Sequence, residues 1–255
     1  MRLRLLRHAT LLLDLAGRRI LVDPMLAEPG AAPPVPNTPN QRPNPLVPLP
    51  VAPREAVHDL DAVLVSHLHT DHLDDRAVEL LVAGPPVPVL CQPEDAEALR
   101  ERGLPDVRPV EDASGGLGWL DVVRTPARHG SGELAEAMAP VSGFLLRAEG
   151  EPSLYLAGDT VLYEGVETVL REEDPDVTVV HGGGARFLEG DPITMDADQV
   201  TRVGQLVRPE ARVVAVHFEA INHCVVSRAE QHEAIGRQGV TNVVLVPEDG
   251  HVLEL

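Results

Sequence analysis

Short apolar runs follow the same order twice along this chain of 255 residues, once before about residue 110 and once after it. In each half, two runs joined by a turn come first, and runs that alternate with helical patterns follow. Two mixed sheets packed face to face, with helices outside, would bury all of these runs. We therefore expect an α/β fold, a four-layer αββα sandwich, in a single domain that covers residues 1–255.

The turn residues and periodicities divide the chain into the following expected elements. In the first half we expect strands over 3–13 and 18–23, paired as a hairpin, strands over 61–67 and 86–91, and helices over 74–82 and 94–102. In the second half we expect strands over 119–126, 141–148, 153–158, 177–181, 212–217 and 242–247, and helices over 164–172 and 196–207. A last helix begins at Ser227, because Glu230 three residues later completes a capping-box pattern.

A proline-rich segment interrupts the first half. Eleven of the 24 prolines lie between Pro24 and Pro53. Proline lacks the backbone N–H and fixes φ, so this stretch forms neither a helix nor an interior strand. The 23 residues before it are too few for a domain, so we interpret residues 28–53 as a long loop rather than a linker. We expect this stiff loop to lie across the functional site or against a second subunit; the rival is a disordered surface insertion.

The charge balance limits the partners of this protein. The chain has 40 acidic and 21 basic residues, a formal net charge of −19. Such a surface repels phosphate backbones and anionic membranes, and no apolar stretch approaches the ~20 residues that cross a bilayer. Two separated cysteines, Cys91 and Cys224, form no CxxC pair and fit a reducing compartment. We expect a cytoplasmic protein that binds a small-molecule substrate and neither nucleic acid nor membrane; whether it forms a homo-oligomer is left open.

The segment 66–72, SHLHTDH, directly follows an expected strand. Side chains alternate along an extended chain, so His67 and His69 point the same way and can hold one metal ion. Asp71 and His72 follow where the chain turns into a helix, and both can face a second ion. Imidazole and carboxylate are suitable ligands for Zn²⁺ and other first-row metals. This density of ligand-type residues favours a metal site over a polar loop that is merely rich in histidine.

Three later strand ends offer further ligands. His129 follows VVRTPAR, Asp159 ends SLYLAGD, and His217 ends RVVAVH. Each of these alone is weak evidence, because a single histidine after a strand is more often a surface residue than a ligand. Together with the segment 66–72 they supply five His and two Asp, enough for two metal sites. Two ions ~3.5–4 Å apart need a carboxylate that bridges them, and Asp159 is the candidate.

These motifs resemble a known family. HLHTDH matches the HxHxDH signature of the metallo-β-lactamase superfamily, and the later order of His, Asp and His matches its remaining metal ligands. The opening hairpin that ends at Asp23, an aspartate expected to support a ligand, and AGDT at 157–160 also resemble that superfamily. RHA at 7–9 and GGGARF with PITMD within 182–196 resemble its branch containing L-ascorbate-6-phosphate lactonase and N-acylphosphatidylethanolamine phospholipase D. The resemblance covers nearly the whole chain and implies the metallo-β-lactamase fold.

The resemblance also implies a centre of two divalent metal ions, zinc foremost and manganese or iron as alternatives, with a bridging hydroxide as the nucleophile. The ligands of the first ion would be His67, His69 and His129. The ligands of the second ion would be Asp71, His72 and His217, with Asp159 shared between the ions. Asp71 would also be catalytic, because it is placed to orient the nucleophile or to accept its proton.

We therefore expect a metal-dependent hydrolase of the lactonase or phosphodiesterase type, acting on a lactone, other ester or phosphodiester of a small anionic molecule. Arg42, Arg128 and Arg186 are the candidates to hold the anionic group. The alternatives are a nuclease, which the net charge disfavours, an iron-dependent redox enzyme, and a non-catalytic metal-binding protein of the same fold.

The roles of three other histidines are left open. The two cysteines are assigned no role in the site. His8 points either toward the site or into the core, and His181 is either an extra site residue or satisfied internally. His223 is the rival of His217 as last ligand, although a strand end is the better-fixed position. Neither cysteine has an arranged histidine partner in the sequence, and Cys91 is expected to be buried and inert.

Overall fold

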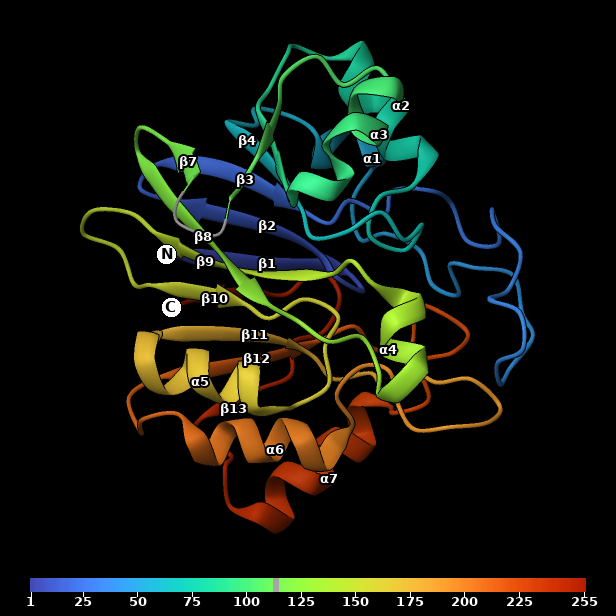
Figure 1. Cartoon of the computed structure of the whole chain (residues 1–255), viewed down its shortest axis with the longest axis vertical. Helices are drawn as coiled ribbons and strands as arrows, with labels where there is room; N and C mark the ends of the chain where they lie inside the picture. Colours follow the sequence, from blue (N-terminus) through green and yellow to red (C-terminus); the bar gives the residue numbers. More distant parts are fainter. Residues whose placement is uncertain (112–114) are drawn as a thin grey trace.

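Two sheets packed face to face form the body of the structure, a computed structural model that describes residues 1–111 and 115–255. Helices cover the outer face of each sheet (Figure 1). The described residues place seven strands in each sheet, and each sheet combines an antiparallel part with a parallel part. The expected α/β architecture of two mixed sheets flanked by helices is confirmed.

The first sheet has the strand order β14-β1-β2-β3-β4-β5-β6. Strands β14 to β3 pair antiparallel, and β3 to β6 pair parallel. The last strand of the chain thus returns to the edge of the first sheet. The bounds are β1 (Arg2–Arg7), β2 (Thr10–Leu15), β3 (Arg18–Val22), β4 (Ala62–Val65), β5 (Val89–Cys91), β6 (Val107–Pro109) and β14 (Val252–Glu254).

The second sheet repeats this plan with the order β13-β12-β11-β10-β9-β8-β7. Strands β7 to β10 pair antiparallel, and β10 to β13 pair parallel. The bounds are β7 (Gly115–Leu117), β8 (Leu120–Pro126), β9 (Ser142–Arg147), β10 (Leu154–Leu156), β11 (Val177–His181), β12 (Arg212–Val216) and β13 (Val244–Leu245).

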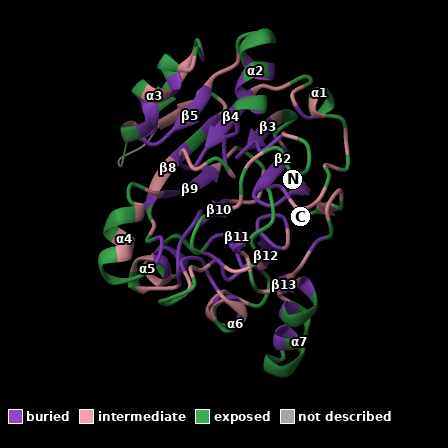
Figure 2. Cartoon of the chain, turned by 90° about the vertical axis from the view of Figure 1, so that its right-hand side faces the viewer, coloured by how far each residue is buried: buried purple, intermediate pink, exposed green. Residues whose placement is uncertain are grey.

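Strand alternation divides the apolar residues among three layers of core. In β12, Val214 and Val216 belong to the cluster between the sheets, whereas Val213 and Ala215 belong to the cluster under the outer helices. Figure 2 shows the strands buried and the helices exposed on their outer sides. Among the described residues, no helix has the length and apolar character needed to cross a membrane. The helices are α1 (Pro53–Ala56), α2 (Asp75–Ala83), the 3₁₀ helix η1 (Pro93–Asp95), α3 (Ala96–Glu101), α4 (Gly132–Met138), α5 (Glu164–Glu173), α6 (Ala197–Leu206) and α7 (Arg228–Gln238).

The structure corrects two expected strands. The run expected as one strand over 3–13 is two strands, because His8 takes a positive φ of 60° and the chain reverses there. The run expected as a strand over 242–247 pairs only at Val244 and Leu245. Strands β6 and β7 and helix α4 were not expected, whereas the capping box of α7 at Ser227 and Glu230 is confirmed.

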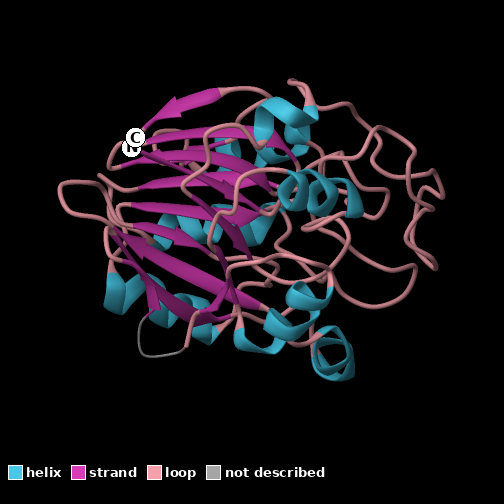
Figure 3. Ribbon diagram, turned by 90° about the horizontal axis from the view of Figure 1, so that it is seen from above, coloured by secondary structure: helices cyan, strands magenta, loops and turns pink. Residues whose placement is uncertain are grey.

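The proline-rich segment runs along one end of the molecule. Residues 28–52, all of them described, form no helix or strand apart from one bridge between Ala32 and Asn44. Figure 3 shows long loops gathered beyond one end of the strands of both sheets. The same end carries the residues that the sequence predicts as metal ligands.

Candidate metal centre

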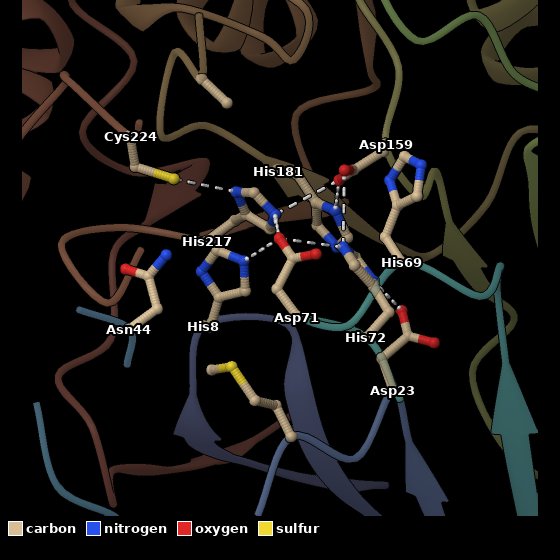
Figure 4. Close-up of polar contacts among 12 residues, drawn as sticks. His8, Asp23, Asn44, His69, Asp71, His72, Asp159, His181, His217 and Cys224 are labelled. Carbon is tan, nitrogen blue, oxygen red and sulfur yellow. Dashed lines mark hydrogen bonds and ion pairs between the residues drawn. The ribbon is translucent and has the colours of Figure 1, made fainter. Parts of the chain in front are cut away.

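The loops that follow four strands meet at one point. Strand β4 leads into His67, β8 leads into His129, β10 leads into Asp159, and β12 leads into His217. Asp71 lies between β4 and α2, and it points toward the same cluster (Figure 4). Since the parallel strands of each sheet end at the same edge, the topology itself brings these side chains together.

The described residues contain three overlapping groups of side chains, and within each group the donor atoms lie within 4.8 Å of one another. The first group is His67, His69, His129 and Asp159. The second group is His8, Asp71, His72 and His217. The third group is His72, Asp159, His181 and His217. The structure therefore brings together all seven residues named from the sequence as ligands, while their binding of metal stays a prediction.

The carboxylate of Asp159 lies at the centre of the cluster. Its Oδ2 atom is 3.3 Å from Nε2 of His129, 3.4 Å from Nε2 of His72 and 3.8 Å from Nε2 of His67. Its Oδ1 atom is 3.4 Å from Nε2 of His217. Ligand atoms on one tetrahedral zinc ion are about 3.4 Å apart, because each lies about 2.0–2.1 Å from the metal. The spacing around Asp159 is close to the one that a shared metal ligand requires.

Asp23, the residue that directly follows β3, supports this cluster through hydrogen bonds. Its carboxylate accepts hydrogen bonds from the backbone N–H of Ser66 at 2.7 Å, from the Ser66 hydroxyl at 2.7 Å and from Nδ1 of His72 at 2.8 Å. Because Nδ1 of His72 donates to Asp23, Nε2 is left free to face Asp159. Carboxylate partners of this kind orient metal-binding histidines.

Two other histidines also have a partner at Nδ1, a backbone carbonyl in one case and a cysteine sulfur in the other. His129 donates to the backbone carbonyl of Ile193 at 2.8 Å. Nδ1 of His217 is 3.5 Å from Sγ of Cys224. The expectation that Cys224 has no histidine partner is therefore wrong. Cys91, by contrast, is fully buried as expected, and burial raises the pKa of its thiol to about 12.

The donor atoms fit a metal centre by two criteria. The Nε2 atoms of His72 and His217 are buried and have no hydrogen-bond partner among the described residues. Burying an unpaired imidazole nitrogen is costly, and a metal ion would satisfy both atoms. The set of imidazoles and carboxylates also matches the ligands that first-row divalent metals bind.

Burial and the neighbouring charged groups together set the pKa values of these side chains. Burial lowers the pKa of His67 and of His217 well below the ordinary value, so both imidazoles are neutral, the form that binds metal. Burial alone would raise the pKa of Asp159. The facing imidazoles of His217, His72 and His129 outweigh it and hold the pKa of that carboxyl well below its usual range.

His8, left open from the sequence, lies inside the cluster. It is fully buried, its Nε2 atom is 3.1 Å from Oδ2 of Asp71, and its ring lies 3.5 Å from the ring of His217. Its backbone carbonyl also accepts the N–H of His217, whose own φ is 73°. His8 therefore holds Asp71 by its side chain and His217 by its backbone.

We expect the substitution His8→Ala to lower kcat by about 10–100-fold, because Asp71 loses the donor that orients it. The substitution His8→Gln offers an amide N–H at a similar reach and is the matched control. Steady-state kinetics at saturating metal measure the effect, and an unchanged kcat in His8→Ala would show that the hydrogen bond to Asp71 is incidental.

The two other histidines that the sequence left undecided, His181 and His223, differ in their relation to the cluster. His181 is buried and lies within hydrogen-bonding distance of Asp159. His223 is also buried but belongs to none of the three ligand groups found among the described residues, so the geometry favours His217 over it.

The three arginines named as anion holders make contacts with groups other than the ligands, or are exposed. The Arg128 guanidinium lies 4.2 Å from the centre of the Tyr163 ring, and Arg186 donates to the carbonyl of Gly190. Arg42 is exposed within the proline-rich segment. Among the described residues, no hydrogen bond or ion pair joins any of the three side chains to a residue of the ligand groups.

Comparison with known proteins defines the class. Residues 18–218 match the model of the beta-lactamase superfamily domain. With this fold and this cluster of His and Asp side chains, the protein is a metal-dependent hydrolase of the metallo-β-lactamase superfamily. The UPF0173 protein YddR of Bacillus subtilis is 35% identical over 96% of both chains, and this chain belongs to the UPF0173 family.

Two solved structures share the fold over the full chain. A possible metal-dependent hydrolase from Veillonella parvula superimposes with a TM-score of 0.94 at 32% identity, covering 100% of this chain and 99% of the other. The isothiocyanate hydrolase from Delia radicum gut bacteria superimposes with a TM-score of 0.92, also at 32% identity and with the same coverage. The narrower resemblance to the branch of L-ascorbate-6-phosphate lactonase and N-acylphosphatidylethanolamine phospholipase D stays a prediction.

Proposed function

We propose that this hydrolase works with two divalent ions, zinc foremost, that share the carboxylate of Asp159. The observation that carries the proposal is the position of the two Asp159 oxygens. Oδ2 lies 3.3 Å from Nε2 of His129 and 3.4 Å from Nε2 of His72, and Oδ1 lies 3.4 Å from Nε2 of His217, so the carboxylate faces imidazoles of both proposed ligand groups. The proposed ligands of the first ion are His67, His69 and His129. The proposed ligands of the second ion are Asp71, His72 and His217.

Asp71 is the proposed catalytic residue. When bound, two such ions would supply a shared water of lowered pKa as the nucleophile, the bridging hydroxide expected from the sequence. The Asp71 side chain is 14% exposed, whereas the Asp159 side chain is 2% exposed, so Asp71 is the more accessible of the two carboxylates. With Oδ2 held by His8, Asp71 can accept a proton at Oδ1 and return it to the leaving group.

The substrate has two candidate classes. The first is the lactone, other ester or phosphodiester of a small anionic molecule that the sequence favoured. A protein cation that held an anionic group would have to lie beside the reacting centre, and among the described residues none of the candidate arginines is joined by a hydrogen bond or ion pair to the proposed ligands. This class therefore has less support than the reaction type itself.

The second class, an isothiocyanate, is favoured by two observations. One is the 32% identity, over the full chain, to a protein described as an isothiocyanate hydrolase. The other is the apolar character of the half-buried residues on that side of the cluster: Cys224, whose Sγ is 3.5 Å from Nδ1 of His217, and Val35 and Val47, which pack with it over the buried Met25, Ala220 and Ile221. Water adding to R–N=C=S gives a thiocarbamate, which breaks down to the amine R–NH₂ and carbonyl sulfide, so no anionic substrate group is needed.

A substrate panel tests these classes. Zinc-loaded protein is assayed against an aliphatic isothiocyanate, a lactone and a bis(aryl) phosphate. We expect kcat/KM for the isothiocyanate to exceed the other two by at least about tenfold, a difference of about 1.4 kcal/mol in the barrier. A faster reaction with the lactone or the phosphodiester would contradict the isothiocyanate proposal and support the anionic class. Hydrolysis of none of them by protein that holds two ions would overturn both.

The proline-rich segment is the proposed wall of the substrate pocket. Asn222, five residues after His217, ties it down: its Oδ1 atom accepts from the Val35 N–H at 2.9 Å and from the Asn44 amide at 2.8 Å. Its own amide donates to the Thr38 hydroxyl at 2.7 Å. All of these groups except Val35 are buried. The segment is thus fixed to the loop that follows a proposed ligand.

The substitution Asn222→Ala removes this attachment. We expect kcat/KM to fall by about tenfold or more, because a displaced pocket wall misplaces the substrate, while the metal content is unchanged. Kinetics with metal analysis measure both, and cleavage of residues 28–53 in limited proteolysis should accelerate. The exposed Asn242→Ala is the matched control. Normal kinetics with a loosened segment would make the segment a passive loop.

A further inference from the structure

His181 has no place in the ligand set that the HxHxDH pattern implies, yet it points into the metal centre (Figure 4). It ends β11, which pairs in parallel with β10 on one side and β12 on the other. Asp159 follows β10 and His217 follows β12. Three neighbouring strand ends therefore deliver Asp159, His181 and His217 side by side.

The separation between His181 and Asp159 distinguishes two roles. Nδ1 of His181 is 2.6 Å from Oδ1 of Asp159. Neighbouring ligand atoms on one ion are farther apart, about 3.4 Å in a tetrahedral zinc site and about 2.9 Å in an octahedral site with 2.1 Å bonds. A distance of 2.6 Å is that of a charge-assisted hydrogen bond. Nδ1–H thus donates to the carboxylate, and the two atoms are not both ligands of one ion.

The packing of His181 fixes this donor in place. Its ring stacks on the ring of His217, with centroids 4.7 Å apart and planes 12° from parallel. Its side chain is 6% exposed, so water has little access to compete for the hydrogen bond. A donor held at Oδ1 prevents the carboxylate of Asp159 from rotating about its own axis. Oδ2 then stays directed at His129 and His72.

We propose that His181 is a positioning residue that holds the Asp159 carboxylate in the orientation that bridges two ions. The inference rests on the proposed dinuclear centre. It assigns to His181 a hydrogen bond to a ligand rather than a bond to metal. The rival, in which His181 itself binds the second ion, corresponds to the group of His72, Asp159, His181 and His217.

Two substitutions separate these roles. His181→Ala removes the donor, whereas His181→Asn keeps an N–H at the position of Nδ1, because both nitrogens are bonded to Cγ. An amide nitrogen does not bind Zn²⁺, so the asparagine can replace a hydrogen-bond donor in that position and not a nitrogen ligand. The exposed His232→Ala on α7 is the matched control for loss of a histidine.

The experiment titrates metal-free protein with Zn²⁺ against a chromophoric chelator, after circular dichroism has shown that each variant is folded. We expect wild type and His232→Ala to bind two ions. In His181→Ala the affinity for one of them should fall by about 10–100-fold, the usual cost of losing a partner that orients a ligand. His181→Asn should recover that affinity to within about threefold, a difference of less than 1 kcal/mol.

Three results of this titration would contradict the proposal, and each points to a different error. Loss of one ion in both His181 variants would make His181 a ligand and overturn the positioning role. Two ions bound with equal affinity in all four proteins would also overturn it, while leaving the dinuclear centre intact. A wild-type titration that ends at one ion per chain would overturn the proposed dinuclear centre, and the positioning role with it.

Discussion

Replacing Asp159 with alanine is expected to abolish the binding of two ions and to lower kcat by about 10³-fold or more, since a bridged metal pair supplies several kcal/mol of transition-state stabilisation. The physical reason is repulsion. Two divalent cations about 4 Å apart at an effective dielectric constant near 20 repel each other by on the order of 15 kcal/mol. The carboxylate of Asp159, which faces both groups of imidazoles, is the shared anion that offsets this repulsion.

Metal analysis and steady-state kinetics on the same preparation measure this effect. The matched control is Asp121→Ala, which removes an exposed carboxylate from β8, the strand that leads toward His129. That variant should retain two ions and normal turnover. Two ions per chain in Asp159→Ala would contradict the assignment of Asp159 as the bridge.

Removing the ions with a chelator is expected to lower the melting temperature strongly as well as abolish turnover. An ion that binds only the folded chain, present at about 1,000 times its dissociation constant, stabilises that chain by about 4 kcal/mol. For a chain of this size each kcal/mol shifts the melting temperature by about 2–4 °C, so loss of one such ion corresponds to about 8–16 °C. In metal-free protein the buried Nε2 atoms of His72 and His217 also lack a partner among the described residues.

Differential scanning calorimetry before and after chelation measures the shift, and adding Zn²⁺ back should restore both the melting temperature and turnover. Calcium added at the same concentration is the control, because a site rich in imidazole disfavours a metal that prefers oxygen ligands. An unchanged melting temperature in protein shown by metal analysis to have lost its ions would contradict a centre that holds the strand ends together.

The sequence was sufficient to predict the layers of the fold and the place where the candidate ligands meet. Short apolar runs gave the strands, and polar residues at the ends of β4, β10 and β12 marked one end of the two sheets, since the parallel strands of a sheet end together. The HLHTDH segment worked as a signal because its residues are adjacent in sequence. His129 and His217 were singled out because each lies at the end of an expected strand, and the order of His, Asp and His matched the remaining ligands of the family.

The features that the sequence analysis missed depend on backbone conformation and on contacts between distant residues, which a local sequence pattern does not contain. The break at His8 was missed because Arg7 to Thr10 contain no glycine, proline or asparagine that would mark a turn, and only a positive φ divides the two strands. His181 could not be assigned, because its partner Asp159 lies on another loop. Cys224 shares a loop with its partner His217, but nothing in the sequence fixes how that loop folds back. Nearness in sequence to a ligand does not fix the direction of a side chain either: the guanidinium of Arg128, next to His129, lies over the ring of Tyr163, and the role of the arginines as anion holders stays a prediction.

The central claim is that two ions share Asp159, and anomalous X-ray diffraction at the metal absorption edge tests it most directly. Crystals of protein purified without added metal should give two anomalous peaks about 3.5–4 Å apart. One peak should lie against Oδ2 of Asp159, beside His67, His69 and His129, and the other against Oδ1, beside His217. A single peak at full occupancy, or two peaks of which only one contacts Asp159, would contradict the account.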